Sequence, residues 1–213
     1  MAGKGNKKQH VPDPVARRLP RYYRYLNDLY HKGVVRVSST SLGGKMGITA
    51  SQIRQDFNHF GGFGYQGYGY DVGELRSQIG HLLGLENHYR AIVIGAGNLG
   101  QALMRNFQFH NIDFELEAAF DIAPALVGTE INGVPILPLG ELEDYVSSHK
   151  PHVAVLTVPQ SAAQSVADRL VRSGIRGIWN FTNVELSASN GEVCIEDIHL
   201  ADSLLTLSYH ING

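Results

Sequence analysis

The segment RAIVIGAGNLGQALMRNF (90–107) decides the fold of the second half of the chain. Its first residues form a short β-branched run typical of a buried parallel strand, and its last residues favour a helix. Between them lies the G-x-G-x-x-G spacing of dinucleotide-binding loops. Gly95 permits a tight turn, Gly97 lets the backbone approach a pyrophosphate, and Gly100 lets helix and strand pack closely. The segment therefore predicts a Rossmann-type nucleotide site.

An acidic residue ends the next predicted strand. The run ELEAAFD finishes at Asp121, 21 residues after Gly100. An acid at this place accepts the ribose hydroxyls of NAD and repels the additional phosphate of NADP, while the helix N-terminus offers N–H groups to the phosphates. We therefore expect NAD as the ligand, held by Gly95, Ala96, Gly97, Asn98, Leu99, Gly100, Asp121 and Ile122.

Strands and helices continue to alternate after this acid. GVPILP, HVAVLTVP and IRGIWNFT favour strands, GELEDYVSSH and QSAAQSVADRLVRSG favour helices, and EVCIEDI is a further candidate strand. This pattern predicts an α/β fold with a doubly wound parallel sheet over residues 87–196, whose ligand lies at the carboxyl ends of the strands. Two segments at that edge could contact the ribose and nicotinamide, or be ordinary loops: Thr157, Val158 and Pro159, and Asn180 and Phe181.

A second glycine motif, GFGYQG (62–67), matches the same pattern in a different context. It follows a predicted helix instead of an apolar strand, and its alternation of Gly and Tyr does not open a helix. The surrounding GGFGYQGYGYDV suits a β-hairpin, in which Gly supplies positive φ and Tyr supplies strand propensity. We predict that this second motif does not bind a nucleotide.

Helix signals flank the predicted hairpin. One helix runs from about Pro20 to Lys32, and a short one covers about Thr40–Met46. Thr49 then opens TASQIRQDFNHF with a capping box, in which Gln52 reaches back to the cap. DVGELRSQIGHLLGL forms the last helix. The order helix, short helix, recognition helix, wing, helix predicts a winged helix-turn-helix domain over residues 11–86.

The predicted recognition helix has two unlike faces. Ile53, Phe57 and Phe60 share one face, and Ser, Gln, Arg and Asn side chains occupy the other. Such polar groups can form directional hydrogen bonds to base edges, although an ordinary solvated helix face has the same composition. With the hairpin, the expected DNA-binding residues are Lys45, Ser51, Gln52, Arg54, Gln55, Asn58, Tyr65 and Tyr68.

Charge separates the two halves. Residues 1–85 carry 12 Lys and Arg against 5 Asp and Glu, whereas residues 86–213 carry 6 against 15. The basic half is the candidate for nucleic acid, and residues 1–10 are expected to be a disordered basic arm. We find neither an 18-residue apolar run nor a signal peptide, which predicts a cytoplasmic protein without a membrane partner. The single cysteine, Cys194, is expected to be buried and inert.

Together these segments resemble the bacterial Rex family of redox-sensing transcriptional repressors. The resemblance rests on RRLPRYYRYL (17–26) and IRQDFNHFG (53–61), which are specific to that family, and on GAGNLG, TVP and NF in the second half. It covers roughly residues 11–211. It implies a homodimer that binds palindromic operator DNA when free or NAD⁺-bound and is released by NADH.

The resemblance also implies a role for the C-terminal residues 197–213. In the family the last helix is swapped and packs against the partner, which would explain the apolar stripe of HLADSLLTLSYHI (199–211) beginning at Leu200. Family members use an Arg/Tyr/Asp network between subunits for switching. Arg24 matches the Arg, whereas Asn106 and His199 stand in place of the other two. The chain also has Gln55 where the family usually has a basic residue, and its wing contains no Lys or Arg.

Two alternatives remain open at this point. One is a small NAD-dependent oxidoreductase, but we find no substrate domain and no placed acid/base group, which favours a protein that is not an enzyme. The other is a regulator with a CoA-type ligand, because the second half also resembles the CoA-binding domains of acyl-CoA synthetases. His149 and His152 are separated by Pro151 and lack further ligands, so no metal site is expected.

Overall fold

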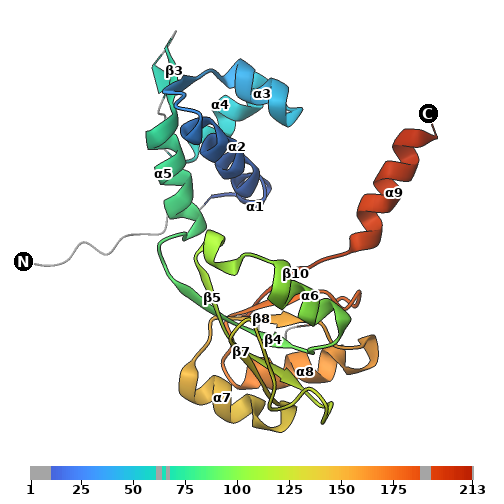
Figure 1. The fold of residues 1–213 in the computed structure, drawn as a ribbon. Helices are drawn as coiled ribbons and strands as arrows, with labels where there is room; N and C mark the ends of the chain where they lie inside the picture. Colours follow the sequence, from blue (N-terminus) through green and yellow to red (C-terminus); the bar gives the residue numbers. More distant parts are fainter. Residues whose placement is uncertain (1–10, 61–63, 66–67, 188–192, 213) are drawn as a thin grey trace, which may run out of the picture. The chain divides into compact units, whose positions relative to one another are not determined.

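A computed structural model of the protein describes residues 11–60, 64–65, 68–187 and 193–212. The chain divides into two compact units, Met1–Glu86 and Asn87–Gly213. The expected basic arm and parts of the second glycine motif, 61–63 and 66–67, lie outside the described residues. Each unit is a fold of its own, as Figure 1 shows.

The first unit is the predicted winged helix-turn-helix. Its antiparallel sheet has the order β1-β3-β2, and β2 and β3 form the wing hairpin. Side chains of Leu26, Ile53, Phe57 and Ile79 meet in its core with no more than 1% exposed. The elements in order are α1 (Asp13–Ala16), α2 (Leu19–His31), β1 (Arg36–Val37), α3 (Ser39–Met46), α4 (Ala50–Asn58), β2 (Gly64–Tyr65), β3 (Gly69–Asp71) and α5 (Val72–Leu83).

Local chemistry fixes where these helices begin. Ser38, Thr49 and Asp71 each precede a helix, and each side-chain oxygen accepts a hydrogen bond from the backbone N–H three residues later. The expected capping box at Thr49 is only half formed, so that prediction was wrong in part. The amide of Gln52 donates to Asp56 Oδ1 at 2.8 Å instead of reaching back to the cap. A hydrogen bond to a charged carboxylate is stronger than one between the neutral amide and a backbone N–H.

The second unit is the predicted doubly wound α/β fold. Seven strands have the order β10-β9-β8-β4-β5-β7-β6, and all neighbours are parallel except the β6–β7 hairpin. The elements are β4 (Tyr89–Ile94), α6 (Asn98–Asn106), β5 (Phe114–Asp121), β6 (Glu130–Ile131), β7 (Val134–Pro138), α7 (Leu142–His149), β8 (Val153–Leu156), α8 (Gln160–Arg172), β9 (Gly177–Asn180), β10 (Cys194–Asp197) and α9 (Leu200–Ile211).

The two faces of this sheet are covered unequally. α7 and α8 lie on one face and bury Leu142, Val146 and Leu170 against it, whereas α6 lies on the other and contributes Met104 (Figure 1). β10 is an edge strand, and its residue Cys194 is exposed. The expectation of a buried thiol was therefore wrong, because an apolar run does not reveal that its strand has a neighbour on one side only. None of the helices in the described part of the chain is long and apolar enough to cross a membrane.

Two adjacent glycines in α3 give a matched test of the helix-turn-helix packing. A Cβ on Gly43 would lie 2.5 Å from the carbonyl oxygen of Ile48, in the backbone of the turn that leads to α4. Gly44 is exposed, and among the described residues no heavy atom lies within 4 Å of the place that its Cβ would take. Gly43→Ala should destabilise the first unit by roughly 1–3 kcal/mol through overpacking. Gly44→Ala should be neutral or stabilising by up to about 1 kcal/mol, because alanine favours a helix. Urea unfolding monitored by circular dichroism measures both, and equal effects would contradict the close packing of this turn.

Candidate nucleotide site and nucleic-acid interface

The glycine loop joins β4 to α6 under tight steric limits. Gly95 has a φ of 95°, in the region that favours glycine, and a Cβ there would lie 2.9 Å from the carbonyl oxygen of Thr157. A Cβ on Gly100 would lie only 2.0 Å from the carbonyl oxygen of Gly95. These two glycines are therefore required by the packing of the protein itself.

Gly97 differs from its neighbours. It is exposed at the N-cap of α6, and among the described residues no heavy atom lies within 4 Å of where its Cβ would be. No side chain of the described residues caps this helix, so its first N–H groups face the same open space. The loop thus has room for a ligand at Gly97, next to a helix terminus that attracts negative charge.

A second loop closes one side of this space. Thr157 follows β8, the strand beside β4 at the point where the strand order reverses. Its hydroxyl donates to the carbonyl oxygens of Gly95 at 2.7 Å and Ile94 at 3.1 Å. Crevices at such switch points are where open α/β sheets bind ligands. The structure therefore brings Thr157 to the glycine loop, as the sequence led us to expect of this edge.

Asp121, at the end of β5, lies against the same loop. Its Oδ2 accepts the N–H of Ala96 at 2.6 Å, and its Oδ1 accepts the N–H of Ala123 at 2.8 Å. Gln101, which the sequence pattern did not single out, donates from its amide to the Ala96 carbonyl oxygen at 2.8 Å. Asp121 thus orients the glycine loop, and a carboxylate oxygen has further lone pairs with which to accept a ribose hydroxyl.

The other residues expected at this edge differ in exposure. Ile122 is 79% exposed beside Asp121, and Leu99 and Pro159 are also exposed, whereas Val158 and Phe181 are half-buried. Asn180 is different because it is 1% exposed. Its amide nitrogen donates to the carbonyl oxygen of Val184 and to Asp197, and its oxygen accepts from Thr182. The side chain of Asn180 therefore orders the loop after β9.

The polar face that we expect to bind DNA is exposed on α4. Ser51, Arg54, Gln55 and Asn58 are all exposed on one side of this helix, opposite the buried Ile53 and Phe57. Arg54 donates to the hydroxyl of Ser39 at 3.1 Å. Lys45 is exposed in the last turn of α3, Tyr68 is 74% exposed at the hairpin, and Tyr65 belongs to β2.

Gln52 stands apart from this face. Its amide is bound to Asp56, which is fully buried and also binds Arg18 and Tyr22 of the α2 segment. Asp56, Arg18 and Tyr22 were all missed from the sequence. The available signal was their position in the two family-specific segments, which gave no indication that they meet.

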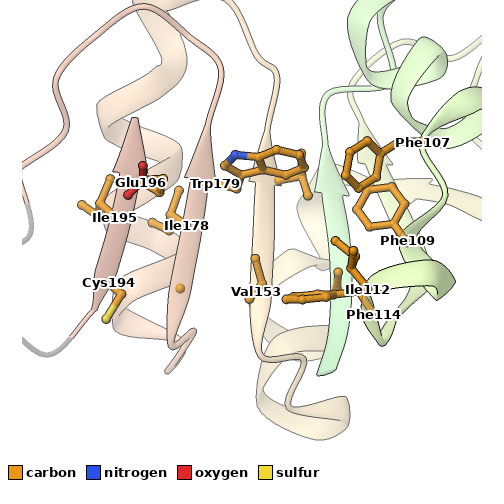
Figure 2. Close-up of a pocket in the computed structure, with 13 residues that line it drawn as sticks. Phe107, Phe109, Ile112, Phe114, Val153, Ile178, Trp179, Cys194, Ile195 and Glu196 are labelled. Carbon is orange, nitrogen blue, oxygen red and sulfur yellow. The ribbon is translucent and has the colours of Figure 1, made fainter. Parts of the chain in front are cut away.

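An apolar cavity of about 380 Å³ lies on the α6 side of the sheet, and Figure 2 shows the residues that line it. Its walls include Phe107, Phe109, Val153 and Trp179, and the rings of Phe107 and Trp179 lie 5.3 Å apart. Several of the lining residues, among them Val153, Gly177, Cys194 and Phe114, begin their strands. The cavity therefore lies toward the amino ends of the strands, away from the glycine loop, and does not belong to the nucleotide crevice.

Comparison with known proteins identifies the family. Family models match residues 10–58, described as "Putative DNA-binding protein N-terminus", and residues 86–184, described as "CoA binding domain". The chain is 48% identical to a redox-sensing transcriptional repressor Rex of Thermoanaerobacter pseudethanolicus, over 97% of this chain and 92% of that protein. It is also 48% identical to the Rex protein of Clostridium tetani, over 97% and 98%. The chain belongs to the Rex family.

Solved structures of Rex-family repressors have the same fold. One, titled a crystal structure of RSP in complex with β-NAD⁺ and operator DNA, is 48% identical and has a TM-score of 0.89, covering 95% of this chain and 93% of that one. Another, titled RSP in complex with β-NADH, is 46% identical with a TM-score of 0.88, covering 95% and 94%. A Rex-family protein therefore binds both a dinucleotide and DNA in this fold.

The residues expected to relay the switch are all near the surface. Arg24 is exposed on α2, and Asn106 is exposed at the end of α6, where its amide donates to the carbonyl oxygen of Ala102. His199 is the N-cap of α9, and Leu200 begins that helix with 60% of its surface exposed. In the part of the chain that the structure describes, no cluster of His, Cys, Asp and Glu could hold a metal ion.

Substitutions at Gly97 and Gly100 should affect ligand binding and folding differently. Gly100→Ala should destabilise the second unit by roughly 1–3 kcal/mol, because its Cβ would overlap the Gly95 carbonyl. Gly97→Ala should cost less than about 1 kcal/mol, the scale of a capping change, yet weaken dinucleotide binding because the methyl group enters the open space. Urea unfolding and calorimetric titration with NADH measure the two effects. A Gly97→Ala variant that binds NADH as tightly as the parent would contradict the assignment of this space to the pyrophosphate.

Proposed function

We propose that this protein is a cytoplasmic repressor that binds operator DNA through its first unit and NAD(H) through its second, and that NADH releases it from DNA. The observation that carries the proposal is the pairing of two candidate sites in one chain. An exposed polar face on α4 is held by a winged helix, and an open glycine loop lies at a switch point with Asp121 beside it. A relative 48% identical has been crystallised with both kinds of ligand.

Asp121 favours NAD(H) over both NADP(H) and CoA. Its carboxylate accepts the N–H of Ala96, the residue before Gly97 in the chain. The carboxylate therefore lies close to the open space at Gly97. A ribose diol can donate to this carboxylate, whereas a 2′-phosphate would be repelled by it. Recognition of CoA has no obvious counterpart to that ribose contact. Structures of the relatives have been solved in complex with NAD⁺ and with NADH. The oxidoreductase alternative is not favoured either, because the relatives are named as repressors.

A homodimer is part of the proposal. None of the residues of α9 is buried, and its Leu204, Leu205 and Ile211 are 66%, 68% and 73% exposed. An isolated amphipathic helix of 12 residues is only marginally stable in water, so α9 needs an apolar surface to cover it. A second copy of the chain would supply that surface, as the resemblance to the family implies, and two copies would also match the two half-sites of a palindromic operator.

The cofactor can control DNA only through a difference between its two forms. A ligand shifts an equilibrium by its differential affinity for the two states. Reduction makes the nicotinamide ring neutral, which lowers the cost of desolvating it in an apolar environment such as that of Val158 and Phe181. NADH then favours a closed dimer whose recognition helices no longer fit successive major grooves, which are about 34 Å apart.

NADH should lower operator affinity at least about tenfold, a coupling of roughly 1.4 kcal/mol, whereas NAD⁺ should not. The test is fluorescence anisotropy of a labelled duplex that the protein itself selects from a random-sequence pool. NADPH serves as the control, because Asp121 opposes its phosphate. Equal affinity for the duplex in saturating NADH and saturating NAD⁺ would contradict redox sensing while leaving DNA binding intact.

Arg54→Ala should weaken binding to the selected duplex by about 1–3 kcal/mol if the guanidinium makes a bidentate base contact. The matched control is Arg172→Ala, which removes the same charge from an exposed position on α8 in the other unit. Both variants should be compared with the parent at one salt concentration, since phosphate contacts depend on salt. Equal losses in the two variants would mean that Arg54 acts only through net charge.

A further inference from the structure

The two family-specific segments of the sequence meet at one buried carboxylate. Asp56 lies toward the end of α4 and is 0% exposed, whereas Arg18 and Tyr22 lie at the beginning of α2. Arg18 and Asp56 are 38 residues apart in the chain. The known roles of a recognition helix, contact with bases and phosphates, do not account for a buried acid on it.

Four hydrogen bonds reach this carboxylate. Arg18 binds it in a bidentate manner, from Nε to Oδ2 and from Nη2 to Oδ1, both at 2.7 Å. The hydroxyl of Tyr22 donates to Oδ2 at 2.7 Å, and the amide of Gln52 donates to Oδ1 at 2.8 Å. Burial alone would raise the pKa of Asp56, but these hydrogen bonds outweigh burial and hold the pKa below its ordinary value. The group is therefore ionised at neutral pH.

This network constrains α4 in a way that its apolar contacts cannot. Ile53 and Phe57 bury α4 against the core, and the rings of Phe57 and Tyr22 lie 5.1 Å apart. Apolar packing is not directional, so it permits small rotations of a helix about its own axis. A bidentate pair has a fixed geometry, and residues 52 and 56 are one turn apart on one flank of α4. Holding that flank fixes the direction in which the exposed side chains of α4 point.

Stability is a weak explanation for such a pair. Replacing a buried ion pair by apolar residues of similar size is often neutral or stabilising, because the charges lose their hydration on burial. Removing one partner is costly because it leaves the other charge uncompensated. A pair that adds little net stability but is directional is suited to specifying one arrangement.

We propose that the Arg18–Asp56 pair, with Tyr22 and Gln52, is the positioning element of the recognition helix: it holds α4 at the rotation about its axis at which Arg54, Gln55 and Asn58 reach the bases of the operator. These four residues act through α4 and do not themselves contact DNA. The inference rests on the proposed function, because it requires sequence-specific binding by α4.

Because Arg18 and Asp56 have opposite charges, their variants can distinguish a loss of positioning from a change in net charge. Asp56→Asn removes a buried negative charge from the unit that binds DNA, so net charge alone would strengthen binding. Arg18→Gln removes a positive charge, so charge alone would weaken it. The double variant Arg18→Met/Asp56→Leu leaves the net charge unchanged. Loss of positioning instead predicts the same change in all three variants.

The measured quantity is the ratio of affinities for a duplex selected by the parent from a random-sequence pool and for a scrambled duplex of the same composition. This ratio should fall at least about tenfold in all three variants at matched salt, the loss expected when one directional base contact is misaligned. Binding to the scrambled duplex should persist, because Lys45 and Arg54 remain. Thermal unfolding should show that the double variant is as stable as the parent or nearly so.

Two further variants control for folding. Glu143→Gln breaks a comparable bidentate pair with Arg169, between α7 and α8 of the other unit, and should leave the affinity ratio unchanged. Tyr22→Phe removes a single hydroxyl from the network and should lower the ratio less than Asp56→Asn does, in the same direction. If the variants of the Arg18–Asp56 pair do not fold, the Tyr22→Phe variant still tests the proposal.

The outcomes separate the inference from the proposed function. If the parent selects no duplex over the scrambled one, the proposed function is wrong. If the parent selects one and the folded variants keep its ratio, the positioning role is wrong. Opposite changes in Asp56→Asn and Arg18→Gln would also overturn it, because they would show that only charge matters.

Discussion

The close approach of two loops at the switch point of the sheet is the constraint on which the second unit depends. The carbonyl oxygen of Gly95 receives the hydroxyl of Thr157 and leaves no room for a side chain at Gly100. Helix α6 therefore packs closely against the glycine loop that follows β4, with Gly97 facing open space. The same contact that packs the fold leaves the open space in which we propose that the pyrophosphate binds, so folding and the proposed ligand site share one short segment.

The first unit depends on contacts that fix the orientation of its recognition helix. Its recognition helix carries exposed polar groups, which do not fix its orientation, and it is oriented from behind by apolar contacts and by the buried Asp56. Arg18 and Tyr22 bind Asp56 from the start of α2, and Arg24, an expected interface residue, follows Tyr22 by two positions on that helix. The hydrogen bonds to Asp56 therefore link the orientation of α4 to that of α2.

Much of this organisation could be predicted from the sequence because it depends on local pattern. The strand before GAGNLG and the helix before GFGYQG were enough to assign a nucleotide loop to one motif and a hairpin to the other. The failures concern properties that depend on distant residues. The exposure of Cys194 follows from the order of the strands, and the partner of Gln52 is a carboxylate whose other ligands lie more than 30 residues away. The bonds of the Asn180 side chain with Val184, Asp197 and Thr182 also could not be predicted from the sequence, and the expected contact of Asn180 with the ligand stays a prediction.

The central claim is that one equilibrium of the dimer links the crevice at Gly97 to the exposed face of α4. Linkage requires that the coupling be reciprocal. DNA must therefore weaken NADH binding by the same factor by which NADH weakens DNA binding. The direct measurement is the dissociation constant of NADH with and without a saturating amount of the selected duplex. We predict that the duplex weakens NADH binding at least about tenfold and leaves NAD⁺ binding unchanged or stronger. An NADH affinity that is the same with and without the duplex would contradict the account.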